Sequence, residues 1–319
     1  MGGPSHQRVA VIIPVYRAHY LAEALDSVFM QTRPADEVIV VDDGSPDRDQ
    51  LQQAIAPYGS GIVVLRQANR GAGAARNRGI AAASAPLVAF LDADDRWTPH
   101  FLRHQLAALA AAPALDLSYT DGVFIGRSAL AGRTFMSVCP SAGEITLEAL
   151  LAQQCTVLLS SVVARRQALL AVGGFDESIR RGQDFDLWLR MAAAGARLAC
   201  DRRVLTLRRM HAANLSGTGS EAIDRPIAVL EKALGAIALT PRERAAATGR
   251  LADLRAQRAR EQGKELLARG DMRAARRALA EASRGLRTWK LQAAVLAMHI
   301  APQLVRRVYL SRALTTASS

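Results

Sequence analysis

Short apolar runs alternate with longer helical patterns through the first half of the chain, and this alternation limits the fold more than any other feature. Four continuous aliphatic runs predict buried strands at 9–14, 37–41, 61–65 and 87–91. Strands are unbroken apolar runs when helices cover both faces of a parallel sheet. Helical patterns lie between these runs, over 21–31 and in the Gly- and Ala-rich segment 71–83. The chain is therefore predicted to form an α/β fold on a mostly parallel sheet.

The character of the sequence changes farther along. Further helices and strands are predicted at 99–112, 117–125, 160–164, 166–171 and 187–194. From about Arg225 onward the strand signals end, and Ala, Leu and Arg dominate. This shift predicts one globular domain over 1–224 and an α-helical region over 225–319. A chain of 319 residues that is 50% hydrophobic can bury a core of this size.

Two features stand out within the predicted helical region. Residues 260–284 are expected to form a helical hairpin that turns at Gly270, because Gly ends helices and Asp271 can cap the next one. Residues 289–313 mix apolar and basic side chains and are interrupted by Pro302. A single hairpin does not establish a repeat array, which needs three or more units.

The net charge of +12 belongs almost wholly to the C-terminal part. Residues 1–220 carry 22 basic and 20 acidic side chains, whereas 221–319 carry 19 and 9. A basic segment suggests nucleic acid or an anionic membrane as partner. One Trp and one Tyr after position 220 offer little base stacking, which disfavours RNA. Two interpretations stay open: a general preference for Arg, or a segment at 289–313 that lies on an anionic membrane or packs on a partner.

Cysteine usage and hydropathy indicate the compartment. Cys139, Cys155 and Cys200 are odd in number and lack the CxxC spacing of zinc and redox sites, so we expect a reducing cytoplasm. No apolar run reaches the length of about 18 residues that a membrane span requires. The run 9–15 lacks a small-residue cleavage site and is expected to be a strand rather than a signal peptide. Peripheral attachment to the inner face of the cytoplasmic membrane stays open.

Three carboxylates follow the fourth predicted strand, at Asp92, Asp94 and Asp95. In open α/β sheets, ligands bind beyond the carboxyl ends of the strands. Carboxylates this close together repel one another unless a cation is present. Oxygen ligands suit Mg²⁺ or Mn²⁺, which commonly bridge a substrate's phosphates. The alternative is a solvated turn in which Asp95 or Thr98 caps the next helix.

Two more acids, Asp42 and Asp43, follow the second predicted strand. They form either an ordinary turn or a pair of acceptors for a ribose or a base edge. The glycines between 69 and 79 match neither the phosphate-loop pattern nor GxGxxG, which argues against an ordinary dinucleotide or ATP site. Arg76, near a helix start, either pairs with a diphosphate or is solvated.

Another acidic pair lies at the start of a later predicted helix. Asp184 and Asp186 flank Phe185, and Trp188 follows. Burial against these aromatic rings would raise the pKa of a carboxyl group toward that of a general base. The alternative is a first-turn pair favoured by the helix dipole. His211 is a single histidine, and such residues are more often structural than ligands.

In this order, the motifs resemble those of inverting family 2 glycosyltransferases, which have the GT-A fold. The matching segments are PVYR after the first strand, VVDDGS, NRGAGAARNRGI, FLDADD, and GGFDE followed by QDFDLWLR. Each motif is weak alone, but five agree in order and spacing over 9–216. The resemblance implies a nucleotide-diphospho-sugar transferase domain with a Rossmann-like mixed sheet, followed by a C-terminal α-helical appendage.

The resemblance implies residues for the sugar donor. Pro14, Tyr16, Asp43 and Asn69 would contact the nucleoside of a nucleotide-sugar, with Asp42 as a neighbour. Arg76 matches the arginine that reaches the donor side of the pocket, where Asp92 also lies.

The resemblance implies a metal site as well. Asp92 and Asp94 match the Asp-x-Asp (DXD) motif, and Asp95 would share or take over the metal contact. His211, in a pattern similar to Arg-x-His-x-x-Asn-x-Ser, would approach the diphosphate or the metal. The implied cofactor is a divalent metal, Mn²⁺ or Mg²⁺.

The implied catalytic base is Asp184, which aligns with the second acid of a Glu-Asp pair. Gln183 departs from this pattern because it stands in the place of the Glu. The acceptor side would be formed by Gly174, Phe175, Asp176, Gln183 and Trp188. The QxxRW pattern of processive enzymes is absent, which implies the addition of one or a few sugars.

The implied activity is transfer of a sugar from a nucleotide-sugar, with UDP favoured, to a hydroxyl of a carbohydrate, lipid-linked or protein acceptor. The expected setting is cell-surface polysaccharide or glycolipid synthesis, without nucleic acid. Two alternatives stay open: an inactive glycosyltransferase-like scaffold, and a basic protein that binds membrane or nucleic acid. A nucleotidyltransferase would need a Gly-rich loop after the first strand, where this chain has PVYRAHY.

Overall fold

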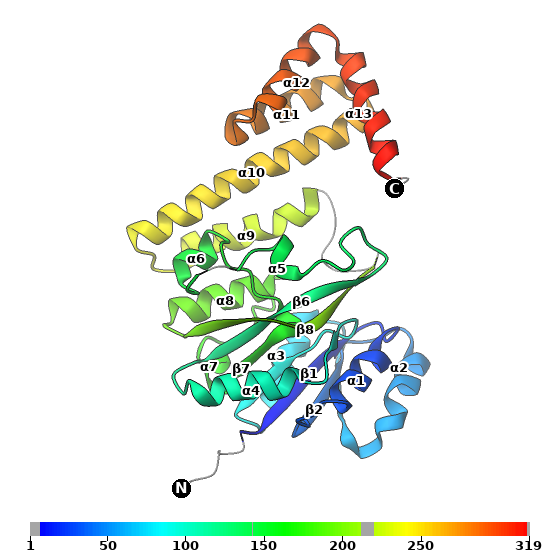
Figure 1. The fold of residues 1–319 in the computed structure, drawn as a ribbon, viewed down its shortest axis with the longest axis vertical. Helices are drawn as coiled ribbons and strands as arrows, with labels where there is room; N and C mark the ends of the chain where they lie inside the picture. The colour runs from blue at the N-terminus through cyan, green and yellow to red at the C-terminus, as the bar shows by residue number, and fades with distance from the viewer. Residues whose placement is uncertain (1–6, 142, 212–219, 318–319) are drawn as a thin grey trace. The chain divides into compact units, whose positions relative to one another are not determined.

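The computed structural model describes residues 7–141, 143–211 and 220–317. The chain divides into two compact units, Met1–Asn214 and Leu215–Ser319, called unit 1 and unit 2 below. Unit 1 holds a sheet with helices packed against it, whereas the described part of unit 2 is helical throughout (Figure 1).

Unit 1 is built on one eight-stranded sheet with the order β3-β2-β1-β4-β7-β6-β8-β5. Its strands are β1 (Val9–Val15), β2 (Glu37–Asp42), β3 (Val63–Arg66), β4 (Leu87–Phe90), β5 (Arg96–Trp97), β6 (Leu117–Gly126), β7 (Val162–Arg165) and β8 (Leu198–Met210). The first four strands in chain order pair in parallel, and β7 joins β4 and β6 antiparallel. The prediction of an α/β fold on a mixed sheet is confirmed.

Within the described residues, the helices of unit 1 are α1 (Leu21–Phe29), α2 (Arg48–Ile55), η1 (Ala56–Gly61), α3 (Ala72–Ala82), α4 (Phe101–Ala111), α5 (Phe135–Val138), α6 (Leu147–Leu151), η2 (Leu159–Ser161), α7 (Arg166–Ala171) and α8 (Gln183–Ala193). Five of these helices have eight or more residues: α1, α2, α3, α4 and α8. The helices predicted near 21–31, 99–112 and 166–171 are present, whereas α2, α5 and α6 were not predicted.

Both faces of β1 are buried, which explains its unbroken apolar sequence. Val9, Val11 and Ile13 belong to the main core cluster, which also contains residues of α1 and α4. Ile12 points to the other face, where it meets Gly79 of α3. A Cβ atom at Gly79 would lie 2.5 Å from the Ile12 side chain, which is too close. Helix α3 can therefore pack this closely on β1 only because residue 79 is glycine.

Strand β8 was missed by the sequence prediction, although it is the longest strand of the sheet, with 13 residues. Its central sequence, RRVLTLRR, is neither a continuous apolar run nor a clean alternation. The strand is held by its long parallel pairing with β6, which contains a register shift between Thr120 and Gly122. Backbone pairing of this kind leaves little trace in the side-chain pattern.

Unit 2 consists of five helices within the described residues. They are α9 (Ser220–Ala236), α10 (Pro241–Arg269), α11 (Met272–Leu286), α12 (Trp289–Ile300) and α13 (Pro302–Ala317). Helix α10 begins at a capping box formed by Thr240 and Glu243, and it ends at Gly270, whose φ is +88°. Asp271 then caps α11 by accepting a hydrogen bond from the Ala274 N–H. The structure therefore has a turn at Gly270, as predicted. The helix before it begins at Pro241 and is longer than expected.

A small apolar core holds α10 to α13 together. Leu267, Ala275, Leu279 and Met298 are buried in it. Gly263 of α10 allows the close approach of Leu279, because a Cβ atom there would lie 2.6 Å from the leucine side chain. Among the described residues, no helix combines the length and the apolar character needed to cross a membrane.

Candidate functional site

The candidate site lies where β1, β2 and β4 end, at one edge of the parallel part of the sheet. Because these strands run in the same direction, the residues that follow them meet at their carboxyl ends. Asp42 ends β2, Asp43 follows it, and Asp92 follows β4 after one residue. Pro14 is buried inside β1, and Tyr16, just beyond the strand, is 44% exposed.

Asp43 organises the loop that follows β3. One of its carboxylate oxygens accepts hydrogen bonds from the Gln67 side chain and the Arg70 N–H, and the other accepts from the Gly71 N–H. Its side chain is buried, whereas Asn69 in the same loop is exposed. Asp42, also buried, accepts from the Ser45 N–H at 2.7 Å. These two acids shape the loops of the site as well as lining it.

Arg76 of α3 is a buried cation with unused donors. Its Nη2 donates to Asp92 Oδ1 at 2.6 Å, and its guanidinium lies 5.4 Å from the centre of the Phe175 ring. Its Nε and Nη1 atoms are buried and have no hydrogen-bond partner among the described residues. Buried donors without acceptors are costly, so this arrangement favours an anionic ligand beside Arg76.

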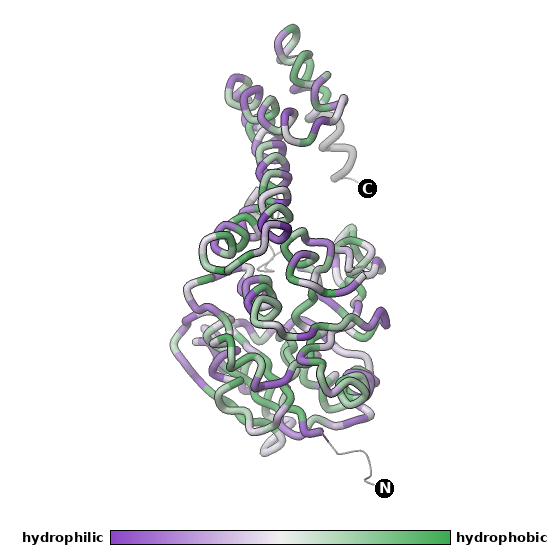
Figure 2. Tube along the Cα trace, turned by 90° about the vertical axis from the view of Figure 1, so that its left-hand side faces the viewer, coloured by the Kyte–Doolittle hydropathy of each residue, from purple (hydrophilic) through white to green (hydrophobic). Residues whose placement is uncertain are grey.

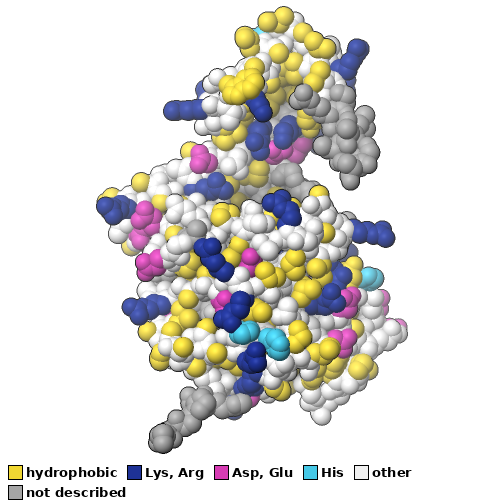
Figure 3. Space-filling view, in the orientation of Figure 1, with side chains coloured by type: hydrophobic (Ala, Val, Ile, Leu, Met, Phe, Trp, Pro, Cys, Tyr) yellow, Lys and Arg dark blue, Asp and Glu magenta, His cyan; other side chains and the backbone are white. Residues whose placement is uncertain are grey.

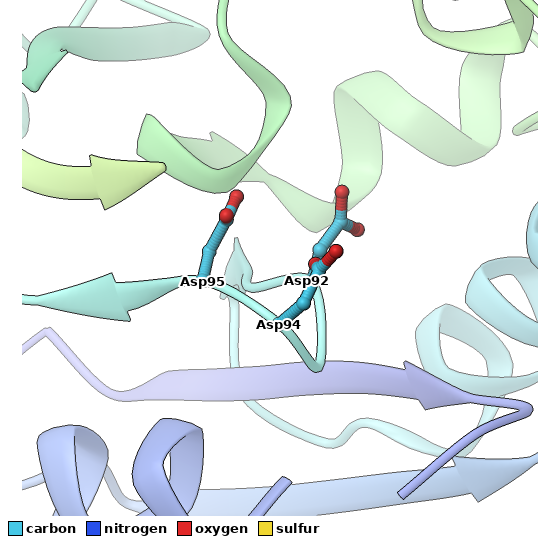
Figure 4. Close-up of side chains that lie close together, drawn as sticks. All are labelled: Asp92, Asp94 and Asp95. Atoms are coloured by element: carbon cyan, nitrogen blue, oxygen red, sulfur yellow. The ribbon is translucent and has the colours of Figure 1, made fainter. Parts of the chain in front are cut away.

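Asp92, Asp94 and Asp95 form a cluster in the loop between β4 and β5 (Figure 4). One carboxylate oxygen from each lies within 4.8 Å of the others, and all three side chains point to the same side of the loop. Burial raises the pKa of Asp94, with repulsion from Asp92 adding to it. Burial, followed by repulsion from Asp94 and Asp92, raises the pKa of Asp95 to about 8. A divalent cation would relieve this repulsion, so the residues fit a metal.

The two oxygens of Asp95 are already engaged by protein donors. Ser160 Oγ donates to one at 2.6 Å, and the Arg209 N–H donates to the other at 2.8 Å. Ser160 Oγ also accepts from the Asp92 N–H at 3.2 Å. Ser160 therefore ties two acids of the cluster together. No local pattern indicates this role, because the sequence predicts Ser160 only as the first residue of a strand.

Residues at the end of β8 and just beyond it contact the Asp92–Asp95 cluster. His211 Nε2 lies 2.9 Å from Asp94 Oδ2, and the His211 ring packs against Tyr20 with ring centres 5.4 Å apart. The side chain of Arg209 donates to the Asp94 carbonyl at 3.1 Å and to Glu23 at 2.6 Å. The predicted partners of His211 in the motif, Asn214 and beyond, lie outside the described residues.

The acids of α8 differ in their surroundings. Asp186 is buried, and it accepts a hydrogen bond from Arg190 Nε at 2.8 Å. Arg190 in turn donates to the carbonyls of Val172 and Gly174, so this pair fastens the preceding loop. Asp184 is partly exposed and accepts from the Phe185 N–H at 2.9 Å. Of the two acids, Asp184 is the more exposed.

A loop that includes Gly174 and Phe175 packs against α3 through Asn77. The Asn77 side chain accepts from the Phe175 N–H and donates to the Phe175 carbonyl, each at 2.8 Å. Gly174, at φ +67°, leaves the room that Asn77 needs, because a Cβ atom there would lie 2.5 Å from Asn77 Oδ1. Glu177 adds an ion pair with Arg70 at 2.6 Å. Asn77 and Glu177 were not among the predicted site residues.

The remaining predicted acceptor-side residues lie around this loop. Phe175 and Trp188 are almost fully buried, so they contribute packing to the site rather than exposed surface. Gln183 is buried as well, and its side chain lies against Gly73 of α3. Asp176 accepts hydrogen bonds from the Ser178 backbone and hydroxyl and forms a turn.

Comparison with known proteins places the chain in a family. Residues 10–129 match the model of "Glycosyl transferase family 2". The uncharacterized glycosyltransferase RP339 of Rickettsia prowazekii is 30% identical over 228 residues, which are 68% of each chain. The pre-mycofactocin glycosyltransferase of Mycobacterium tuberculosis is 32% identical over 208 residues, which are 61% of this chain and 41% of that protein.

Solved structures share the fold. The mannosyltransferase PcManGT of Pyrobaculum calidifontis, in complex with GDP-Man and Mn²⁺, superposes with a TM-score of 0.65 and 20% identity. It covers 98% of this chain, which in turn covers 87% of that one. TarS 1–349 of S. aureus, in complex with UDP-GlcNAc, gives a TM-score of 0.62 at 17% identity and covers 97% of this chain and 92% of its own. The sheet, the motifs at its edge and the relatives that match two thirds of the chain thus identify this protein as a family 2 glycosyltransferase with the GT-A fold.

Proposed function

We propose that the chain is an inverting, metal-dependent glycosyltransferase that moves a sugar from a nucleotide-sugar, with a UDP-sugar favoured, to an acceptor hydroxyl. The observation that carries the proposal is the pairing of Arg76 with the Asp92–Asp95 cluster. A buried guanidinium with two unused donors lies directly beside carboxylates that need a cation. A diphosphate bound to a divalent metal would satisfy both needs.

Asp92, Asp94 and His211 are the residues that would hold the metal. Asp95 would support them from behind, because both of its oxygens accept from Ser160 and Arg209. An imidazole beside carboxylates suits Mn²⁺ better than Mg²⁺, which prefers oxygen ligands. When bound, the metal would neutralise the negative charge that develops on the departing diphosphate. The Mn²⁺ bound to the structural neighbour PcManGT supports this assignment.

The nucleoside would lie over the loops that Asp42 and Asp43 shape, between Tyr16 and Asn69, whose side chains are exposed beyond the ends of β1 and β3. Pro14, buried in β1, would support this pocket from below. The UDP-GlcNAc bound to TarS and the GDP-Man bound to PcManGT support a nucleotide-sugar as the donor.

The proposed chemistry needs one carboxylate as general base. Asp184 would accept the proton of the acceptor hydroxyl while that oxygen attacks the anomeric carbon on the face opposite the diphosphate. This single displacement inverts the configuration, and no covalent sugar–enzyme intermediate forms. Asp184 suits the role because its carboxylate is partly exposed, whereas Asp186 is buried and paired with Arg190.

The catalytic machinery is proposed to lie within unit 1, and the acceptor is proposed to be a carbohydrate, a lipid-linked sugar or a protein. The loop around Gly174 and Asp176, with Gln183 beside it, would form the acceptor side. Transfer of one or a few sugars in cell-surface polysaccharide or glycolipid synthesis fits a chain without the processive QxxRW pattern.

A thermal-shift screen tests the donor class. UDP-, dTDP- and GDP-sugars are added to the full chain with Mn²⁺ and with a chelator. A donor that is present at 100 times its dissociation constant stabilises the fold by about 2.7 kcal/mol. We expect one nucleotide class to raise the melting temperature, and only with the metal. If no nucleotide-sugar shifts the transition under either condition, the proposed donor site is wrong.

A further inference from the structure

The last two helices of unit 2 expose several large hydrophobic side chains. Trp289, Leu296 and Ile300 of α12 are 72%, 64% and 80% exposed, and Leu304 and Val308 of α13 are 59% and 44% exposed. Spacings of seven and four residues place the members on each helix along one side of it. We call these five residues the outer apolar face. Figure 3 shows hydrophobic side chains gathered on unit 2, with Lys and Arg among them.

The opposite side of α12 and the neighbouring side of α13 are covered. Leu291 and Val295 pack against the unit 2 core, where Met298 is buried, and Val305 and Tyr309 of α13 join them. Helices α12 and α13 are thus apolar on two sides, with polar residues interleaved along the chain (Figure 2). A helix that is apolar on two sides normally buries both of them. The residues of the outer apolar face are 44–80% exposed, so this face fits a binding surface.

The charge along α12, α13 and the residues just before them has one sign. After Glu281 the sequence holds six Lys and Arg and no Asp or Glu. Arg287, Lys290 and Arg307 are exposed, and Lys290 Nζ lies 5.9 Å from the centre of the Trp289 ring. Arg306 has an internal role instead, since its Nε donates to the Leu267 carbonyl at the end of α10.

We propose that the outer apolar face binds the surface of an anionic lipid bilayer. Apolar side chains would enter the acyl boundary, while Arg287, Lys290 and Arg307 would contact lipid phosphates. A second copy of the chain fits the face poorly, because a two-fold interface would bring the cations of both copies together with no acidic residue from this segment to pair with them. The proposal concerns where unit 2 binds and does not depend on sugar transfer by unit 1.

Vesicle sedimentation of the full chain tests the proposal. Vesicles of phosphatidylcholine alone are compared with vesicles made of equal parts of phosphatidylcholine and phosphatidylglycerol. We expect binding to the anionic vesicles and little binding to the neutral ones. The double variant Lys290→Gln/Arg307→Gln should bind about 30-fold more weakly, because each basic residue near an anionic surface contributes about fivefold. Leu296→Gln/Ile300→Gln should bind about tenfold more weakly or worse.

Matched control variants test whether binding depends on where a basic or apolar side chain lies, or only on how many the chain has. Arg48→Gln/Arg242→Gln removes the same charge from exposed sites elsewhere, and Met30→Gln/Leu170→Gln removes exposed apolar side chains from α1's end and α7. All four double variants alter exposed positions, so their melting temperatures should match that of the parent chain. Both controls should bind anionic vesicles as the parent chain does.

Three outcomes would overturn the proposal. The first is that the parent chain does not bind anionic vesicles, and the second is that it binds neutral vesicles equally well. The third is that the control pairs weaken binding as much as the α12–α13 pairs do. If vesicle binding is absent and Leu296→Gln/Ile300→Gln abolishes a concentration-dependent dimer, the face is an interface between two copies instead.

Discussion

Asp184 and Asp186 lie two positions apart in α8, yet their surroundings assign them different tasks. Asp186 is buried, and its partner Arg190 binds the carbonyls of Val172 and Gly174. Asp184 is partly exposed in the first turn of the helix. The sequence left open whether this pair is catalytic or structural. The contacts favour one role for each acid.

Replacement of each acid by its amide should therefore affect a different property: turnover for Asp184 and stability for Asp186. Asp184→Asn should lower turnover by about 10²–10⁴-fold, because the proposed general base is lost, with donor affinity nearly unchanged. Asp186→Asn should instead lower stability by about 1–3 kcal/mol, since it leaves the half-buried Arg190 without its anion. Single-turnover kinetics and thermal unfolding measure the two effects. Normal turnover in Asp184→Asn would refute the assignment of the base.

Ser160 offers a second test at the scale of single residues. Its hydroxyl donates to Asp95 and accepts from the Asp92 N–H, so it supports the proposed metal ligands without being one. Loss of such a supporting contact typically weakens metal binding by about 10–100-fold. We expect this loss of Mn²⁺ affinity in Ser160→Ala, measured by calorimetric titration.

The neighbouring serine provides the control. Ser161 is equally buried, but its hydroxyl donates to the Leu158 carbonyl and accepts from the Thr120 N–H, away from the acids. Ser161→Ala should lower stability while Mn²⁺ affinity stays unchanged. Equal metal affinities in the two variants would show that Ser160 does not support the cluster.

At the scale of elements, the sequence predicted the strands that are continuous apolar runs and missed β5 and β8, which are not. β1, β2 and β4 are continuous apolar runs, and Asp42, Asp43 and Asp92 lie at the ends of β2 and β4 as predicted. β8 carries arginines through its length, so no periodicity marked it. Its pairing with β6 is a long-range property, and the contacts of Asp95 with Arg209 and of Asp94 with His211 depend on it. The resemblance to a family suggested His211, but no local pattern could have suggested Arg209.

Glycine in α3 gives a test of helix-to-sheet packing. Gly79→Ala should destabilise unit 1 by about 1–3 kcal/mol, because the added methyl group would lie 2.5 Å from Ile12. Gly249 in α10 has open space at the same position, so Gly249→Ala should stabilise unit 2 by about 0.5–1 kcal/mol through helix propensity. Denaturant unfolding measures both. A neutral Gly79→Ala variant would contradict the close approach of α3 to β1.

Glu37 links the start of β2 to the turn after α3, and this link should depend on pH. Burial opposes its ionisation, but hydrogen bonds from the Ser84 hydroxyl and N–H outweigh this and lower the pKa of Glu37. A carboxyl group with a lowered pKa in the folded state stabilises the fold above its unfolded pKa, and the contribution is lost as pH falls through the folded value.

We therefore expect Glu37→Gln to cost about 1–2 kcal/mol of stability at neutral pH. The difference from the parent chain should disappear in acid, below the ordinary range of a glutamate pKa. Urea unfolding from neutral to acidic pH measures it. A difference that is the same at every pH would show that the ionised form of Glu37 contributes nothing.

At the scale of the whole molecule, charge and chemistry are divided along the chain. The first 220 residues are nearly neutral overall, and their acids gather at the ends of the strands of unit 1. The positive charge lies in the helices of unit 2, around an apolar face. Composition predicted this division. The exposed side chains of α12 and α13 are the basis for the proposal that unit 2 binds anionic lipid.

The central claim is that Arg76 and the Asp92–Asp95 cluster form a site for a metal-bound nucleoside diphosphate. Calorimetric titration of UDP into the full chain tests it most directly, with Mn²⁺ and with a chelator, for the parent chain and for Asp94→Asn. We expect the parent chain to bind UDP about 100-fold more tightly with Mn²⁺, and Asp94→Asn to lose most of this gain. If the parent chain binds UDP equally well with and without the metal, or binds neither UDP nor another nucleoside diphosphate, the claim is contradicted.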